Sequence, residues 1–250
     1  MNHQTIRDVL LARGTVPFDQ PRQFIHFARN DDGDALLNDL DHYPHAFVLG
    51  CVMDRQILAE KAWIIPYEIK RRLNTFEFAD LKQLSLEEAH HVISQPTPLH
   101  RFPTIMARFL YLAIQRIAER YHDNASNIWA NSPSSATVVG RFRQFDGIGP
   151  KIATMAANSL ARDFKVPLHD KYSIDISTDV HVQRVFKRLG LVQANASLED
   201  IISTARDMNP DYPGIFDLPT WEIGHTWCSP RNPRCDECYM KEICPRIIWQ

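Results

Sequence analysis

Four of the five cysteines lie within the last 23 residues, at the spacing Cys228-x6-Cys235-x2-Cys238-x5-Cys244. An odd number of cysteines grouped in this way fits poorly with a disulfide framework, which would spread bridges through a small secreted chain. Thiolates gathered in one short segment are typical metal ligands. We therefore expect a single metal site here, and we expect the isolated Cys51 to be a small buried apolar residue.

A second group of residues with chemical potential is the short segment Gly147-Ile148-Gly149, followed by Pro150 and Lys151. Glycines permit positive φ and let backbone N–H groups approach a ligand closely. Proline suits the first position of a helix, whose free N–H groups and dipole favour an anion. The segment therefore predicts a phosphate-binding hairpin. An ordinary helix corner with a glycine C-cap is the alternative.

The elements that must position these groups are helices, because apolar residues recur at three-and-four spacing and convincing period-two runs are absent. Ser85 and Glu88 form a capping-box pattern before one of them. The segment 165–177 breaks the helical pattern, and we expect it to join two helical lobes. The predicted helices cover 46–58, 59–73, 86–94, 101–121, 134–145, 150–162, 179–189, 197–208 and 213–227.

The composition is that of a soluble globular protein, with 250 residues, 44% of them hydrophobic and 23% charged. No apolar run approaches the roughly 20 residues of a membrane span, and the N-terminus lacks a signal-peptide core, so we expect a cytoplasmic protein. The net charge of -2 hides an uneven distribution. Residues 1–60 hold nine acids and five bases, whereas residues 101–151 hold seven bases and three acids. Taken alone, such a basic stretch is better explained by solvated helix faces.

Three motifs together resemble the endonuclease III superfamily of DNA glycosylases. The segment 145–153 resembles its helix-hairpin-helix, and the segment 177–185 resembles the stretch that carries an essential aspartate, with Asp179 in that place. The cysteine spacing is that of the family's iron–sulfur loop. The motifs occur in the family's order, and the resemblance covers roughly residues 44 to 245.

The resemblance implies an all-α fold with two helical lobes and a DNA-binding cleft between them. A helical barrel lobe would cover 44–165, with the hairpin near 145–151. A cluster lobe would combine 1–43 with 166–250, including the iron–sulfur loop 228–244. The implied partner is double-stranded DNA containing damaged bases or abasic sites, bound by a nucleoid-associated monomer.

The implied activity is that of a bifunctional glycosylase and abasic-site lyase, acting on oxidised pyrimidines. Lys151 would be the nucleophile that forms a Schiff base, and Asp179 would stabilise positive charge on the sugar. Taken alone, the position of Lys151 favours a surface lysine that binds phosphate. Asp179 taken alone is a helix N-cap, an interpretation that is compatible with a catalytic role. Asp175 is the rival carboxylate.

For the cysteines, the resemblance implies a [4Fe–4S] cluster with a structural role. It would hold the loop so that Arg231 and Arg234 face DNA phosphates. Zinc and free thiols are the alternatives, although structural zinc sites usually pair two short Cys-x2–4-Cys units and this chain has one.

A glycosylase must extrude its target nucleotide, which leaves a gap in the duplex. Gln56 matches the family's position for a gap-filling glutamine. Leu99 or His100, in the segment 98–101, would be the wedge inserted into the base stack. A helix-surface glutamine and a loop leucine are the plain alternatives.

The sequence also departs from the family's pattern. Phe145-Asp146 stand where the family has Leu-Pro, Pro150 replaces a basic residue, 169–173 is an apparent insertion, and residues 1 to about 40 have no counterpart. These departures leave the substrate open. A monofunctional thymine or uracil mismatch glycosylase and a non-catalytic iron–sulfur DNA-binding protein are therefore the competing hypotheses.

Overall fold

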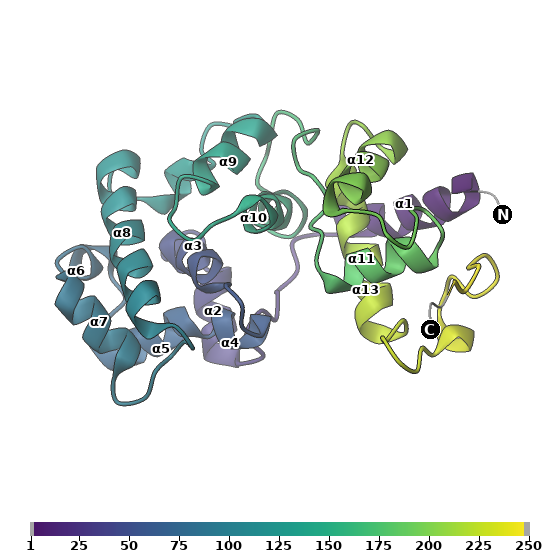
Figure 1. Ribbon diagram of the computed structural model, residues 1–250. Coiled ribbons are helices and arrows are strands. Elements are labelled where there is room, and N and C mark those ends of the chain that lie inside the picture. Colours follow the sequence, from purple (N-terminus) through teal and green to yellow (C-terminus); the bar gives the residue numbers. More distant parts are fainter. Residues whose placement is uncertain (1–2, 248–250) are drawn as a thin grey trace. The chain divides into compact units, whose positions relative to one another are not determined.

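A computed structural model of the chain describes residues 3–247 (Figure 1). These residues form α-helices and short 3₁₀ turns and no strand, which confirms the predicted all-α class. None of the described helices is both long enough and apolar enough to cross a membrane. The chain divides into two compact units. We call residues 23–133 with 140–156 the hairpin unit, and residues 1–22 with 134–139 and 157–250 the cysteine unit.

The hairpin unit is built around a helix that is buried on all sides. Each of the ten residues of α3 (Pro44–Met53) is buried, as expected for a helix that is apolar all round. It packs against its neighbours α2, α4, α5, α8 and η1. The other elements of this unit are α2 (Asp31–Asn38), α4 (Ala59–Trp63), α5 (Ile65–Leu73), α6 (Phe78–Leu81), α7 (Leu86–Ser94), α8 (Pro103–Tyr121) and η1 (Ala125–Ile128).

Two helix ends in this unit differ from the prediction. The helix expected over 46–58 ends at Met53, because Asp54 leaves the helical conformation and Gln56 is left-handed with φ 54°. The helix expected over 59–73 is divided at Ile64 into α4 and α5, with Pro66 in the first turn of α5. The capping box at Ser85 and Glu88 is confirmed at the start of α7.

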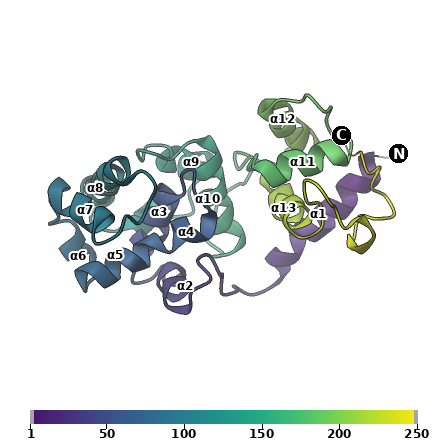
Figure 2. The same cartoon turned by 60° about the horizontal axis from the view of Figure 1, so that its bottom comes forward.

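The cysteine unit contains α1 (His3–Asp19), α11 (Val180–Arg188), α12 (Leu198–Met208), η2 (Pro213–Phe216), α13 (Asp217–Thr226) and η3 (Cys235–Glu237). The single helix expected over 213–227 is therefore a 3₁₀ turn followed by α13. Figures 1 and 2 show α1 and α13 side by side. Two further helices, α9 (Ser135–Phe142) and α10 (Pro150–Arg162), contribute residues to both units.

The N-terminal segment is shared between the two units, whereas the sequence placed all of 1–43 with the cluster lobe. Helix α1 packs on α13, and the Arg13 guanidinium donates two hydrogen bonds to Glu222, of 2.9 and 2.6 Å. Residues 23–43 instead belong to the hairpin unit. Their extended part is held by α2, where Asn38 exchanges hydrogen bonds of 3.0 and 2.9 Å with the backbone of Ile25.

Candidate functional site

The predicted hairpin is present between α9 and α10, and apolar contacts hold it. Phe145 is buried and stacks on Tyr121 of α8, with ring centroids 6.1 Å apart and planes 8° from parallel. Gly147 has φ 91°, and a Cβ at this position would lie 2.7 Å from the Phe109 ring. Ile148 is buried, whereas a Cβ on Gly149 would meet nothing within 4 Å. Only glycine therefore fits at position 147 without strain. At position 149 the space beside the backbone is open, so there is room for a Cβ.

Lys151 is exposed and is the second residue of α10. In the same unit, Asp54 directly follows α3 and is half-buried. Burial raises the pKa of the Asp54 carboxyl above its ordinary value, and the charge of Lys151 opposes this rise. A carboxylate thus lies within electrostatic range of the lysine, and it was not among the site residues predicted from the sequence. No clear signal in the sequence marked this position, because the apolar pattern continues past Asp54 to Leu58.

The two loops predicted to carry the gap-filling and wedge residues are joined by hydrogen bonds. The backbone carbonyl of Arg55 accepts a hydrogen bond of 3.1 Å from Nε2 of His100, whose Nδ1 accepts from the Phe102 N–H. The next carbonyl, that of Gln56, accepts a 3.3 Å hydrogen bond from the Arg101 guanidinium. The Gln56 side chain is exposed. Residues 45 positions apart in the sequence therefore form one surface feature.

The two wedge candidates differ in accessibility. His100 is only 3% exposed, and its ring bonds the backbone at both nitrogens. Burial lowers the pKa of this imidazole. Leu99 is partly exposed, and its N–H donates to the Ile93 carbonyl at 2.9 Å. Of the two, Leu99 is the side chain that a duplex could reach, while His100 fastens the loop. The guanidinium of Arg72 supports the same loop through the carbonyls of Val92, Gln95 and Thr97.

Asp179 is the N-cap of α11 in the cysteine unit. Its Oδ1 accepts hydrogen bonds of 2.8 Å from the backbone N–H groups of His181 and Val182. The N-cap interpretation is therefore confirmed, and the cap fixes the orientation of the carboxylate. The rival Asp175 is committed to Arg206 through two hydrogen bonds of 2.7 and 2.8 Å. Asp179 is thus the carboxylate that carries no ion pair among the described residues.

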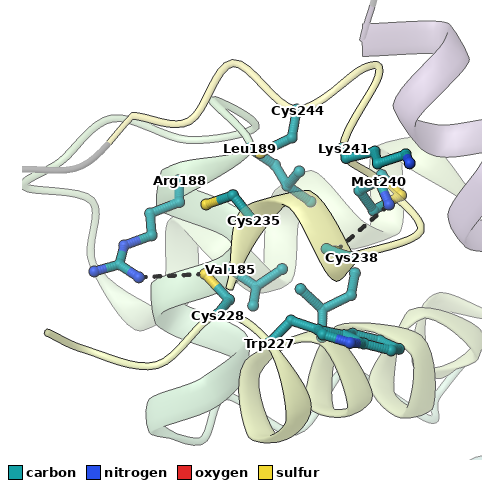
Figure 3. Close-up of a pocket in the computed structure, with 11 residues that line it drawn as sticks. Val185, Arg188, Leu189, Trp227, Cys228, Cys235, Cys238, Met240, Lys241 and Cys244 are labelled. Atoms are coloured by element: carbon teal, nitrogen blue, oxygen red, sulfur yellow. Dashed lines mark hydrogen bonds between the residues drawn. The ribbon is translucent and has the colours of Figure 1, made fainter. Parts of the chain in front are cut away.

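The four clustered cysteines line one cavity, which Figure 3 shows. Apolar side chains form much of its remaining wall: Val185, Leu189, Ile223, Trp227 and Met240. Within residues 3–247, no three His, Cys, Asp or Glu side chains converge as a site for a single metal ion. The four cysteines therefore share one cavity, but their side chains do not converge on a single point in it. The separate Cys51 is fully buried, as expected, and burial raises the pKa of its thiol well above the ordinary value.

Three of the four sulfurs accept hydrogen bonds from N–H groups. The Arg188 guanidinium donates to Cys228 Sγ at 3.3 Å, and the backbone of Met240 donates to Cys238 Sγ at 3.5 Å (Figure 3). The Arg246 N–H donates to Cys244 Sγ at 3.4 Å. N–H donors directed at sulfur stabilise thiolates, and they tune the reduction potential of a metal group that the thiolates hold.

Two arginines of α11 hold the start of the cysteine loop in place, a role that was not predicted from the sequence. Arg184 donates to the Cys228 and Gly224 carbonyls, at 2.6 and 2.8 Å. Arg188 is 8% exposed and donates to the carbonyls of Ser229 and Pro230, at 2.7 and 2.8 Å. Their spacing of four places both on one helix face, which was the only signal in the sequence.

The two loop arginines predicted to face phosphate are both exposed. Arg234 pairs with Glu237 at 2.8 Å and donates to the Thr226 carbonyl at 2.6 Å. Arg231 forms no ion pair among the described residues. Arg231 is therefore the guanidinium that is available for a phosphate without losing a protein partner.

The described residues form an all-α fold with a lysine-bearing hairpin and a loop of four cysteines, and this fold is similar to that of solved endonuclease III structures. No family model matches the sequence. The chain is 31% identical over 98 residues to "Endonuclease III" of Thermotoga maritima, covering 39% of this chain and 41% of that protein. It is 32% identical over 85 residues to "Endonuclease III homolog" of Encephalitozoon cuniculi, covering 31% and 32%. The matches thus span less than half of the length of these relatives.

Solved structures match over nearly the whole chain. A trapped endonuclease III–DNA covalent intermediate has TM-score 0.62 and 18% identity, covering 98% of this chain and 97% of that one. A thermostable thymine-DNA glycosylase has TM-score 0.59 and 14% identity, covering 96% and 95%. At these identities the likeness establishes the fold.

Proposed function

We propose that this chain is a bifunctional DNA glycosylase and abasic-site lyase of base excision repair, with oxidised pyrimidines as its substrates. The observation that carries the proposal is Lys151, exposed in the first turn of α10 directly after the glycine hairpin. The likeness to endonuclease III, including a structure described as a covalent intermediate with DNA, supports it.

In this mechanism the neutral ε-amine of Lys151 attacks C1′ of the extruded nucleotide. The C1′–N bond to lysine forms while the bond to the base breaks, and the base leaves with the bonding electrons and takes up a proton. Opening of the sugar gives a protonated Schiff base. Loss of a C2′ proton then expels the 3′-phosphate and cuts the strand. The Asp179 carboxylate stabilises the positive charge on the sugar.

The hairpin and the two joined loops would hold the DNA. Backbone N–H groups around Gly147, Ile148 and Gly149 bind phosphate at the start of α10. Gln56 fills the gap left by the extruded base, and Leu99 enters the stack as the wedge.

The donor set at the cysteine loop fits a [4Fe–4S] cluster. Four thiols line one apolar cavity, and three of them accept N–H hydrogen bonds. Cys228, Cys235, Cys238 and Cys244 would hold the cluster, which would serve as a structural cross-link of the loop that carries Arg231 and Arg234. A brown protein that absorbs broadly near about 400 nm is expected. Anaerobically purified protein that is colourless and zinc-loaded would refute this assignment.

Borohydride trapping tests the catalytic proposal. Duplexes carrying an oxidised pyrimidine, a thymine or uracil mismatch, or an abasic site are incubated with protein and borohydride. We expect covalent adducts with the oxidised-pyrimidine and abasic duplexes, and none with Lys151→Ala. Lys61→Ala is the matched control, since Lys61 is also exposed in the first turn of a helix, and it should trap like wild type.

Two outcomes would contradict the proposal in different ways. Base release without any trapped adduct would favour a monofunctional mismatch glycosylase. Absence of both reactions on every duplex would favour a non-catalytic DNA-binding protein. In either case, a steep decrease of DNA affinity with salt is expected from phosphate contacts.

A further inference from the structure

Three aromatic rings cluster on the cysteine unit outside the site described above. Trp221 and His225 of α13 stack with centroids 4.7 Å apart and planes 11° from parallel. His181 of α11 lies 6.3 Å from Trp221 and 5.9 Å from His225. The helices can approach closely here because Gly224 has no side chain. A Cβ at this position would lie only 2.6 Å from the His181 Cβ. Trp221 is nevertheless 42% exposed, so the stack is open to solvent.

The orientation of the His181 ring is fixed by Arg184. The guanidinium nitrogen lies 3.0 Å from Nδ1 of His181. Because a guanidinium can only donate, Nδ1 is the acceptor and the ring proton is on Nε2. The backbone N–H of the same histidine caps on Asp179. The cluster therefore contains a defined N–H donor on a residue two positions after this carboxylate.

A basic hollow of about 320 Å³ adjoins this cluster through Arg184, which lines it. None of the residues around the hollow is acidic: they are Val180, Gln183, Arg184, Lys187 and Arg188. The two arginines are held in place by carbonyls of the segment 224–230. The lining therefore holds three cationic side chains against a nearby acid, Asp179, whose charge acts on Arg184. Such an excess of positive charge favours an anion such as a phosphate.

We propose that Trp221, His225 and His181 form a nucleotide-binding platform, on which a nucleobase stacks while its phosphate lies over the hollow at Arg184 and Lys187. A flat ring suits the open face of the stack, since every nucleobase has a π face. The His181 Nε2–H donates to an acceptor on the base edge. The combination of stacked rings and fixed cations matches a nucleotide in chemistry. The assignment of that nucleotide to DNA rests on the proposed function.

Binding to two duplexes tests the platform. The Lys151→Ala protein is used so that DNA is not cut, and fluorescence anisotropy compares a duplex having one unpaired adenine with a fully paired duplex of equal length. We expect the parent to bind the unpaired-base duplex more tightly. Adding Trp221→Ala should weaken that binding about tenfold, as expected for one base stacked on an aromatic ring, and should leave the paired duplex unchanged.

Two further variants keep the result interpretable. Trp221→Phe retains an aromatic face and should keep most of the preference. Tyr172→Ala removes another exposed aromatic side chain of the same unit, 55% exposed, and should change nothing. The proposal would be overturned if the Lys151→Ala protein bound both duplexes with equal affinity. It would also be overturned if adding Trp221→Ala left the preference for the unpaired-base duplex intact, or weakened binding to both duplexes equally. The two proposals can fail separately. If the preference depends on Trp221 but the wild-type protein neither releases a base nor forms a borohydride-trapped adduct, the platform is supported and the glycosylase proposal is refuted.

Discussion

The hairpin and the cysteine loop are held in place by different physical means. The hairpin rests on apolar contacts, with Phe145 buried against Tyr121 and Gly147 against Phe109. The cysteine loop contributes few buried side chains, chiefly Cys238 and Met240. Its backbone is instead fastened by donors from Arg184 and Arg188. A loop with so little apolar burial depends on specific bonds, whereas the hairpin folds as part of a core.

The largest effect should come from removing one cysteine. Cys235→Ser should lose iron, and backbone amides of 228–244 should exchange hydrogen much faster, because the proposed cluster is the main cross-link of this loop. Amides near 145–151 should stay protected, as measured by hydrogen exchange with mass spectrometry. Cys51→Ala is the control and should retain iron. Equal protection of 228–244 in both variants would show that the loop needs no cluster.

A smaller effect is expected in the hairpin from Gly147→Ala. The added Cβ would lie 2.7 Å from the Phe109 ring, and the alanine would have to adopt the φ of 91° that Gly147 has. The free energy of unfolding should therefore fall by about 2 kcal/mol. DNA affinity should fall with it. Gly140→Ala is the control, since a Cβ there meets nothing within 4 Å in α9, and it should stabilise by about 0.5–1 kcal/mol. Urea unfolding measures both, and an unchanged Gly147→Ala variant would contradict the packing argument.

Arg188→Lys should destabilise the cysteine unit by about 2 kcal/mol, because a lysine cannot replace hydrogen bonds to two carbonyls and a sulfur. The iron content should also decrease. Arg206→Lys serves for comparison, since Arg206 pairs with Asp175 while its side chain is 50% exposed, and its effect should be small. Thermal unfolding with an iron assay distinguishes the two. Equal effects would show that the buried arginine has no special role.

The smallest effect concerns Asp54 in the hairpin unit. Since burial raises the pKa of this carboxyl, its ionised form destabilises the fold. The destabilisation is fully present above the raised pKa and disappears as pH falls below the ordinary carboxyl value. Asp54→Asn should therefore raise Tm by a few degrees at pH 7, and this gain should vanish in acid. Exposed Glu119→Gln should show no such pH dependence. A lower Tm for Asp54→Asn at pH 7 would contradict the burial argument.

The sequence predicted the helical class, the long periodic helices and the three motifs, because these depend on local spacing. Helix α10 begins at Pro150 and α11 follows its Asp179 cap as expected. The end of α3 was placed too late, since the apolar pattern continues past Asp54 where the backbone leaves the helix. Local patterns carry no information on which backbone carbonyls a distant side chain will reach. Arg72, Arg188 and the buried His100 therefore acquired their roles only in three dimensions.

The hydrogen bonds from His100 and Arg101 to the carbonyls of Arg55 and Gln56 have a consequence for protein engineering. The two stretches constitute one cassette, encoded in two places. If only one of the two stretches were replaced by the corresponding stretch of a related protein, the backbone carbonyls would no longer face their hydrogen-bond donors. Only exchange of both stretches together would preserve these hydrogen bonds. A natural sequence change in one stretch is likewise restricted by the need to keep the hydrogen bonds to the other.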